Sequence, residues 1–289
     1  MAGLAARSVN GERLTVNRKG GERPVYRSLF TVHALFCFTA SPLTSQAIQD
    51  NSFLLEEAYN QESGVVQHIS SFARSSSGNW TYSFTQEWPL GGIRHQLSYT
   101  VPIHHAYATG TGLGDIALNY RYQLAGNPSA RTVMAPRLSL VLPTGDDQLE
   151  RGSGGVGFQG NLPVTLVLSP SLASHWNAGA TVTPSNHNGL GEKATTTDFN
   201  LGASLVWLLR PSFNLLVETL WLSEQFVEGE GQAAREESGF VSPGFRMAFN
   251  LAGGLQIVPG VAYALGVAPK GMEDFLFLYL SFEHPFKRQ

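Results

Sequence analysis

Segments that alternate apolar and polar residues with a period of two recur along the chain. In GDIALNYRYQL (114–124), Leu118 and Tyr120 fall on one face of an extended chain, and Asn119 and Arg121 fall on the other. Successive side chains of a β-strand point to opposite faces. The segment therefore predicts a strand with one apolar and one polar face. In a soluble sandwich the apolar face would point inward, whereas in a membrane barrel it would point toward lipid.

Twelve such segments are predicted as strands. They lie near 64–74, 79–90, 93–104, 114–124, 131–143, 157–168, 173–183, 198–209, 213–223, 239–250, 254–266 and 274–286. No amphipathic helical period persists for three turns. The even number of strands is what a single-chain bacterial barrel requires.

The connections between these segments differ in length according to their position. The even-numbered ones are short and turn-like, such as PLGG and RPS, whereas most odd-numbered ones are long and polar, such as PTGDDQLERGSGGV and SEQFVEGEGQAAREES. The first connection, SSSG, is an exception. Short periplasmic turns opposite long extracellular loops are typical of outer-membrane barrels. We therefore predict an all-β chain that forms a transmembrane antiparallel up-and-down β-barrel of about 12 strands, with long loops outside.

The composition agrees with this class and excludes others. Only 14% of the 289 residues are charged, against roughly 25% in a typical soluble domain. No run approaches the roughly 20 apolar residues of a membrane-spanning helix. Residues 1–47 carry six basic and two acidic side chains, which leaves 13 basic and 20 acidic ones in the rest of the chain. This negative balance argues against nucleic acid as a partner.

Residues 1–47 are predicted to be an N-terminal extension and a secretory signal peptide. Arg23 and Arg27 precede the apolar run 29–40, and the segment ends in Ser-Gln-Ala, with cleavage predicted after Ala47. The single cysteine, Cys37, lies in this segment. The mature chain is therefore expected to contain no thiol for disulfides, zinc or catalysis.

Two further segments flank or close the predicted barrel at 64–289. Residues 48–63 combine an apolar triplet with two glutamates, and either a plug in the periplasmic mouth or a disordered leader would fit this pattern. The last strand ends near Phe286. It is similar to the closing strand that the barrel-assembly machinery recognises in outer-membrane proteins, so this machinery is an expected partner.

The polar faces of the predicted strands define the candidate lumen. Its candidate pore residues are Glu87, Arg94, Asp115, Asn119, Arg121, Arg137, Asp198, Glu218 and Arg246. One interpretation is a salt-bridge network that fills a narrow interior. The other is a charged lining that sets solute preference. The two interpretations are compatible.

Other motifs point to no cofactor or metal. The G-x-G-x-x-G pattern at 152–157 precedes a strand, whereas a dinucleotide site needs a helix there. His104 and His105 are adjacent and point to opposite faces, so they are a poor chelating pair. Asp146, Asp147 and Glu150 are interpreted as a solvated loop cluster rather than a cation site.

The chain is also predicted not to be an enzyme. A barrel-wall lipase would need a Ser-His pair, for which His95 is the candidate histidine on an outer face. No nucleophile-elbow pattern accompanies it, and no Ser/His/Asn spacing supports a catalytic set. No catalytic residue is therefore assigned.

Four stretches resemble a known family. LLEEAYNQESGVVQHI, GLGDIALNYRYQL, RLSLVLPTGD and GFQGNLPV are similar to the MetA-pathway phenol-degradation family of outer-membrane barrel proteins, over most of residues 53–286. The resemblance implies a channel-like outer-membrane protein linked to aromatic catabolism. It identifies no substrate-binding motif.

These observations predict a monomeric barrel in the outer membrane of a diderm bacterium. Its expected function is passive passage of small solutes, and the resemblance adds aromatic or hydrophobic ones. Expected partners are outer-membrane lipids, lipopolysaccharide and the solute. The alternatives are a phospholipase-like enzyme of the barrel wall and a structural or adhesive barrel with a closed lumen.

Overall fold

The computed structural model describes residues 52–127 and 129–285. The predicted signal peptide, its cleavage after Ala47 and the closing Phe286 lie outside these ranges. Within them, no helix is long and apolar enough to cross a membrane.

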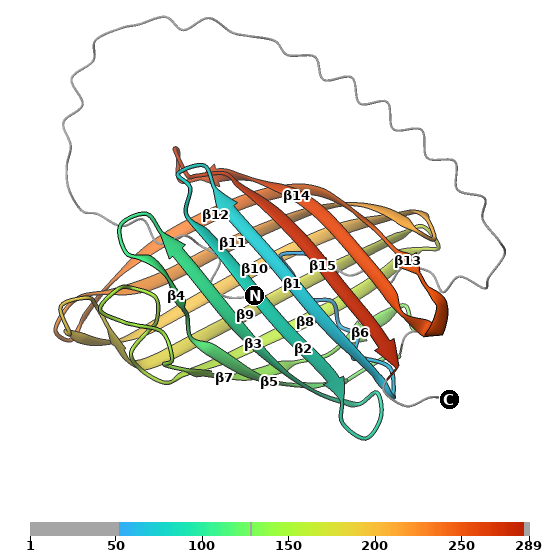
Figure 1. Ribbon diagram of the computed structural model, residues 1–289, viewed down its shortest axis with the longest axis horizontal. Coiled ribbons are helices and arrows are strands. Elements are labelled where there is room, and N and C mark those ends of the chain that lie inside the picture. The colour runs from blue at the N-terminus through green and yellow to red at the C-terminus, as the bar shows by residue number, and fades with distance from the viewer. Residues whose placement is uncertain (1–51, 128, 286–289) are drawn as a thin grey trace, which may run out of the picture. The chain divides into compact units, whose positions relative to one another are not determined.

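Twelve long or medium strands form one closed antiparallel barrel (Figure 1). They are β1 (Val65–Ser75), β2 (Trp80–Pro89), β3 (His95–Ala106), β5 (Ile116–Tyr122), β7 (Arg137–Leu142), β8 (Gly157–Ser169), β9 (Leu172–His187), β10 (Lys193–Arg210), β11 (Phe213–Gly229), β12 (Gln232–Met247), β14 (Gln256–Ala268) and β15 (Phe275–Pro285). Neighbours in this order pair with each other, and β15 pairs with β1 over the full length of both. The predicted twelve-stranded up-and-down barrel is confirmed.

Three short strands continue long ones across an interruption. β4 (Gly110–Leu113) pairs with β3 ahead of β5, β6 (Thr132–Met134) pairs with β8 ahead of β7, and β13 (Phe249–Asn250) pairs with β14 beyond β12. The break between β6 and β7 falls at Pro136, which has no N–H to donate to a ladder. A short 3-10 helix, Ala252–Gly254, follows β13.

The faces of the strands are distributed as in a membrane barrel. On β5 and β7, Leu118 and Leu138 are 46% and 65% exposed on the outer face, while Asn119 and Arg137 are buried on the inner one. Because the apolar side chains face outward and the polar ones inward, the pattern is the inverse of a soluble core.

The interior has two chemically different sides. Strands β2, β3, β5, β7, β8 and β9 supply buried polar residues, which include Gln96, Asn161 and Asn177. Strands β10, β11, β12, β14 and β15 supply most of a buried apolar cluster, which includes Leu220 and Phe277. We call these the polar wall and the apolar wall.

Three of the predicted long loops are in fact strand hairpins, namely HAYATGTGLG, PSNHNGLGEKATTT and SEQFVEGEGQAAREES. In the first, β4 pairs back onto the end of β3. β9 and β10 continue to His187 and Lys193, and β11 and β12 are joined only by Glu230 and Gly231. Antiparallel pairing satisfies the backbone of these extensions, but most of their residues are polar, and the few apolar ones, such as Phe226 and Val227, do not alternate with a period of two. The apolar alternation that marks a strand is therefore absent there, and the prediction of loops was wrong for them. Residues 143–156, between β7 and β8, do form a long connection.

Candidate lumenal site

The segment Ser52–Gln61 lies against the inner faces of the strands. Its first contact is made by Glu218 of β11, whose side chain is fully buried. Oε1 of Glu218 accepts the backbone N–H groups of Phe53 at 3.0 Å, Leu54 at 3.0 Å and Leu55 at 3.2 Å. Three hydrogen bonds to one carboxyl group fix the course of the segment here.

Side-chain amides of the polar wall continue this pairing. Asn177 accepts the N–H of Glu56 at 3.0 Å and donates to its carbonyl oxygen at 2.7 Å. Gln123 donates to the carbonyl of Ala58 at 2.9 Å and accepts the N–H of Asn60 at 3.2 Å. The wall thus supplies to this irregular segment the partners that a neighbouring strand would otherwise provide.

Thr165 and Gln96 complete the set. Oγ1 of Thr165 accepts the N–H of Ala58 at 2.9 Å, and Oε1 of Gln96 accepts the N–H of Gln61 at 2.7 Å. The segment is therefore bound along its length, from Phe53 to Gln61.

The apolar wall binds the segment through close packing. The ring of Phe53 lies 5.8 Å from that of Phe277 and 5.3 Å from that of Tyr279, centroid to centroid. A Cβ on Gly260 would lie 2.3 Å from Cζ of Phe53, and one on Gly244 would lie 3.1 Å from its Cε2. These two glycines leave the space that the ring fills.

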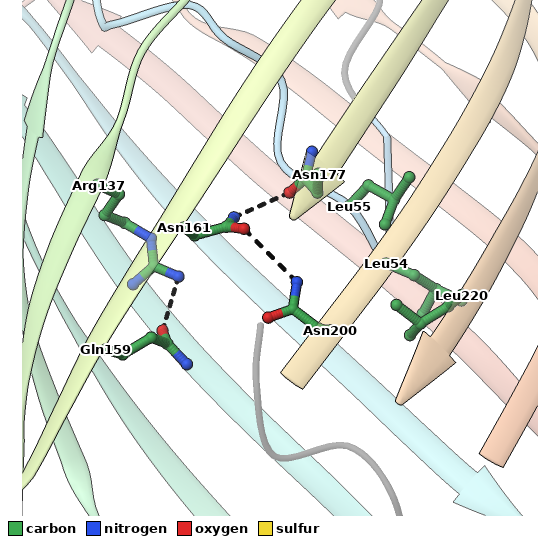
Figure 2. Close-up of a pocket in the computed structure, with 8 residues that line it drawn as sticks. All are labelled: Leu54, Leu55, Arg137, Gln159, Asn161, Asn177, Asn200 and Leu220. Atoms are coloured by element: carbon green, nitrogen blue, oxygen red, sulfur yellow. Dashed lines mark hydrogen bonds between the residues drawn. The ribbon is translucent and has the colours of Figure 1, made fainter. Parts of the chain in front are cut away.

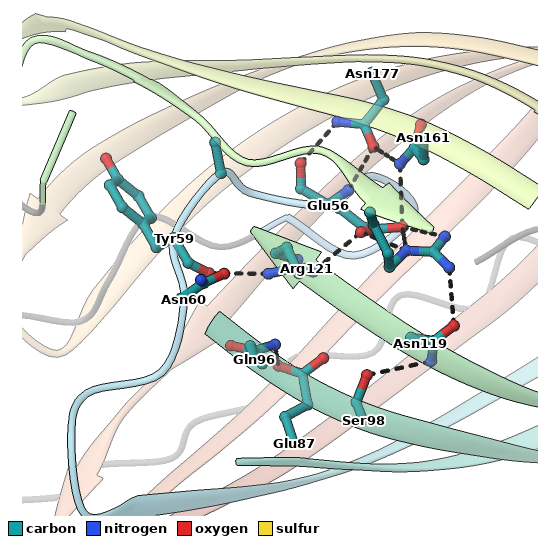
Figure 3. A network of polar contacts seen from close by, with 12 residues as sticks. Glu56, Tyr59, Asn60, Glu87, Gln96, Ser98, Asn119, Arg121, Asn161 and Asn177 are labelled. Atoms are coloured by element: carbon teal, nitrogen blue, oxygen red, sulfur yellow. Dashed lines mark hydrogen bonds and ion pairs between the residues drawn. The ribbon is translucent and has the colours of Figure 1, made fainter. Parts of the chain in front are cut away.

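The carboxylate of Glu56 sits between two arginines of the polar wall, Arg121 and Arg137. Figure 3 labels Glu56 and Arg121. Nη2 of Arg121 donates to Oε2 at 3.0 Å. Nε of Arg137 donates to Oε1 at 2.8 Å, and its Nη2 lies 2.6 Å from the same oxygen. Nδ2 of Asn161 donates to Oε1 at 3.1 Å. Two guanidinium groups and one amide thus form a site for a single carboxylate.

Arg137 is also held from behind by neutral residues. It donates to Oδ1 of Asn119 at 2.9 Å, to Oε1 of Gln159 at 2.8 Å, and to the hydroxyl of Ser139. These partners come from β5, β7 and β8. They hold the guanidinium in addition to its bonds with Glu56.

A small cavity adjoins this cluster (Figure 2). It is lined by Leu54, Leu55, Arg137, Gln159, Asn161, Asn177, Asn200 and Leu220. One side therefore offers amide and guanidinium groups, and the other offers three leucine side chains. The space measures about 10 Å³, roughly the room of one water molecule.

The predicted pore residues fall into distinct positions. Six of them are buried in the lumen, namely Glu87, Asn119, Arg121, Arg137, Glu218 and Arg246. Oδ1 of Asp198 accepts the N–H of Gln225 at 2.8 Å, near the hairpin end of β10 and β11. The carboxylate of Asp115 binds Gly145 and Ser153 of the long β7–β8 connection.

Arg94 corrects the prediction. It lies in the turn between β2 and β3 and is exposed, so it does not line the lumen. β3 begins at His95, whose side chain faces outward, and the first lumenal side chain of this strand is Gln96. Arg94 has the parity of the lumenal residues but lies in the preceding turn.

The neutral residues that bind the segment were not among the predicted pore residues. Gln96, Thr165 and Asn177 are buried and alternate with apolar neighbours, as the charged residues do. Apart from Asn119, the prediction selected side chains by charge. Neutral polar residues at lumen-facing strand positions were the signal that could have identified them.

The histidines considered as catalytic or metal-binding candidates bond to side chains of neighbouring strands. Nδ1 of His95 lies 2.7 Å from the hydroxyl of Tyr120, and its ring packs on Tyr122. His104 bonds Thr81 and His105 bonds Thr111, on opposite faces of β3. No group of three or more His, Cys, Asp or Glu that could hold a metal ion occurs in the described ranges.

The β7–β8 connection is attached to the neighbouring hairpin by a hydrogen bond between side chains. Nδ1 of His187 lies 2.8 Å from Oδ2 of Asp147, and this hydrogen bond lowers the pKa of the Asp147 carboxyl from its usual range. The backbone N–H of His187 donates to the carbonyl of Ser153 at 2.8 Å. The connection is therefore attached to the barrel at two places, Asp115 and His187.

Comparison with known proteins identifies the family. Residues 46–273 match the family model described as "Putative MetA-pathway of phenol degradation". The chain belongs to this family. No curated protein sequence matches it.

Solved structures of outer-membrane channels share the fold. The COG4313 outer membrane channel from Pseudomonas putida F1 has a TM-score of 0.56 and 16% identity, over 78% of this chain and 97% of that one. The NanC porin has a TM-score of 0.49 and 9% identity, over 75% of this chain and 98% of that one. The likeness to the COG4313 channel shows that this barrel has the fold of outer-membrane channels of Gram-negative bacteria.

Proposed function

We propose that the protein is a passive outer-membrane channel for small solutes. The observation that carries this proposal is the divided lumen, in which amide and guanidinium groups face leucine and aromatic side chains across a small cavity. Such a passage would offer both polar and apolar contact to one solute. Membership of the phenol-degradation family favours aromatic or hydrophobic solutes.

The segment Ser52–Gln61 is proposed to act as the constriction of this channel. Its backbone is bonded to both walls, and Phe53 is packed between Gly244 and Gly260. A segment held in this way would leave only a narrow path beside it. Large solutes such as oligosaccharides would therefore be excluded.

The surroundings of the protein are proposed on the same grounds. The exposed apolar outer face fits embedding of a monomer in the outer membrane. Contact with lipopolysaccharide outside, and recognition of the last strand by the barrel-assembly machinery, follow from this location. The residues 1–47 would then be the export signal.

Solute flux through the refolded full barrel tests the channel. Liposomes that contain the protein should swell in small neutral aromatic and aliphatic solutes and not in oligosaccharides, and planar bilayers should show small conductance steps. Protein-free liposomes are the control. Absence of both swelling and conductance would contradict the channel.

A closed barrel with functional extracellular loops is the second candidate. It is favoured by the number of hydrogen bonds that bind Ser52–Gln61 inside the lumen. The same flux measurement separates the two functions, because a closed barrel would give neither liposome swelling nor conductance.

A further inference from the structure

We propose that an apolar groove on the outer face of β2, β3, β5 and β7 binds one anionic phospholipid of the periplasmic leaflet. One acyl chain would lie in the groove, and the phosphate would be held by arginines of the adjoining short turns. This inference rests on the proposed place of the barrel in the outer membrane, and it does not require the lumen to conduct.

The groove is a concavity of about 490 Å³ in the barrel wall, which is within the range of sites that hold small organic molecules. Two rows of outward side chains on β3, β5 and β7 form its sides. The rows are Leu97, Tyr120 and Leu138, and Tyr99, Leu118 and Leu140. Between them lies the backbone of Ser98, Asn119 and Ser139, whose buried side chains point into the lumen. The groove therefore opens away from the lumen.

The solvent of this outer face is lipid, so the groove is open to acyl chains. Leu118 and Leu138, which line it, are 46% and 65% exposed. Acyl chains are as apolar as leucine, so hydrophobicity alone does not draw one into the groove. A gap beside these side chains would forfeit dispersion contacts, however, and a flexible chain can fill it. Shape thus favours an occupant, and a second feature is needed to select the lipid.

That feature is the charge of the adjoining turns. Residues 90–94 join β2 to β3 and contain Arg94, and residues 123–131 lead from β5 to β6 and contain Arg131. Both arginines are exposed, and neither turn contains Asp or Glu. At the opposite end of the barrel, the connection 143–156 carries three carboxylates and one arginine. Basic side chains near a membrane surface attract anionic headgroups.

Both guanidinium groups have the capacity to bind a phosphate. Within the described ranges, the side chains of Arg94 and Arg131 form no hydrogen bond or ion pair. Guanidinium groups bind phosphate oxygens in bidentate geometry. A phospholipid headgroup is the phosphate that lies at this level of a bilayer and carries an acyl chain toward the groove.

The spacing along the strands fits one lipid molecule. The row that contains Leu97 and Tyr120 begins two residues above His95, or about 7 Å along the strand. At the rim, Nδ1 of His95 lies 2.7 Å from the hydroxyl of Tyr120. A phosphate at Arg94 would therefore meet a polar rim first, and the ester-linked chain would continue into the apolar groove.

Native mass spectrometry of the full barrel tests the site. The protein would be refolded into vesicles of phosphatidylglycerol and phosphatidylethanolamine in equal amounts, released in a mild detergent, and scored for each lipid that remains bound. Leu118→Trp fills the groove. Leu205→Trp is its matched control, because Leu205 is 47% exposed on the outer face of β10 and lies outside the groove.

The native barrel should retain one phosphatidylglycerol. Leu118→Trp should lower this retention by about fivefold or more, because the indole occupies the space of the chain, and Leu205→Trp should not. Arg94→Gln/Arg131→Gln should reduce the preference for phosphatidylglycerol by about fivefold or more, since each arginine attracts the anionic headgroup. Arg210→Gln, at an exposed position of the same end of the barrel on β10, should leave the preference unchanged.

Three results would overturn the site. They are equal retention by Leu118→Trp and Leu205→Trp, an unchanged preference in Arg94→Gln/Arg131→Gln, and a particle of two barrels that Leu118→Trp separates, which would assign the groove to a second copy of the chain. If Leu118→Trp does not fold, Leu138→Trp replaces it in the same comparison.

Lipid retention and solute flux are separate measurements, so the two proposals can fail independently. A barrel that retains phosphatidylglycerol but neither swells liposomes nor conducts would overturn the channel and support this site. A barrel that conducts but retains no phospholipid would overturn this site and support the channel.

Discussion

Single glycines determine how closely the segment Ser52–Gln61 can approach the apolar wall. A Cβ on Gly260 would overlap the Phe53 ring, and a Cβ on Gly202 would lie 2.3 Å from Cδ2 of Leu55. The wall and the segment are therefore complementary at the level of individual atoms. This complementarity is a property of two regions far apart in the sequence.

Gly260→Ala should destabilise the folded barrel by about 1–3 kcal/mol, because the added methyl group overpacks the Phe53 socket. The thermal transition from the fast-migrating to the slow-migrating form on gels measures the change. Gly160→Ala on β8 is the control, since its Cβ would come no closer than 3.9 Å, to Leu138. Equal effects of the two substitutions would contradict close packing of Phe53.

Glu218→Gln should weaken the attachment of the segment by about 1.5–3 kcal/mol, because three backbone N–H groups lose a charged acceptor. Cleavage of residues 52–63 by added protease should become faster while the barrel remains folded. Glu228→Gln, at an exposed position of the same strand, should leave the cleavage rate unchanged. Protection that survives Glu218→Gln would contradict the role of this carboxylate.

At the scale of elements, the strands were predictable because their signal is local. The alternation that places Leu118 outside and Asn119 inside can be read within one segment. The position of Ser52–Gln61 could not be predicted, because it depends on side chains from β3, β8, β9 and β11. The charges of Glu56 and Arg121 are visible in the sequence, but their pairing across 65 residues is not.

The difference between local sequence signals and long-range pairing also explains the hairpins. At the tips of the two hairpins, Lys193–Asp198 and Gln232–Glu237 consist mostly of polar residues, so no apolar alternation separates a paired strand from a loop there. Their pairing partners, β9 and β11, decide the matter. Arg94 shows a second limit. It continues the alternation of Gln96 and Ser98, but the strand begins only at His95, so the Arg94 side chain is exposed in the turn.

The β7–β8 connection should loosen in acid. A carboxyl whose pKa is lowered in the folded state adds stability above its unfolded pKa, and this contribution is lost as the pH falls through the lowered value. Asp147 is such a group, because His187 donates to it. Hydrogen exchange at the His187 amide, which bonds to Ser153, should therefore accelerate relative to its intrinsic rate below about pH 4.

Asp147→Asn tests whether titration of Asp147 causes this acid response. The amide keeps the shape of the side chain but removes the charge, so the acid-dependent step should disappear and protection should already be lower at neutral pH. A step of unchanged size in Asp147→Asn would assign the acid response to another group, such as Asp115, which holds the same connection.

At the scale of the whole molecule, the barrel places apolar side chains outside and polar ones inside, which is the opposite of a soluble protein. Leu205 and Trp207 of β10 are 47% and 56% exposed on the outer face. Ser204, which precedes Leu205, is buried inside. Closure between β1 and β15 leaves no free edge. Such a molecule gains its stability from lipid around it as well as from contacts within it.

Leu205→Arg should therefore cost about 2–4 kcal/mol in a bilayer if Leu205 lies near the midplane, because a charge on the lipid face must be desolvated. Refolding into vesicles of defined lipid, followed by the mobility shift on heating, measures the folded fraction against urea. Gln232→Arg, at the exposed tip of the β11–β12 hairpin, adds the same charge in water and should have no comparable effect. If Leu205→Arg were as stable as the native chain, or if the native chain were recovered as a soluble periplasmic protein, the outer face would meet water, and the proposed place in the outer membrane would fall with it.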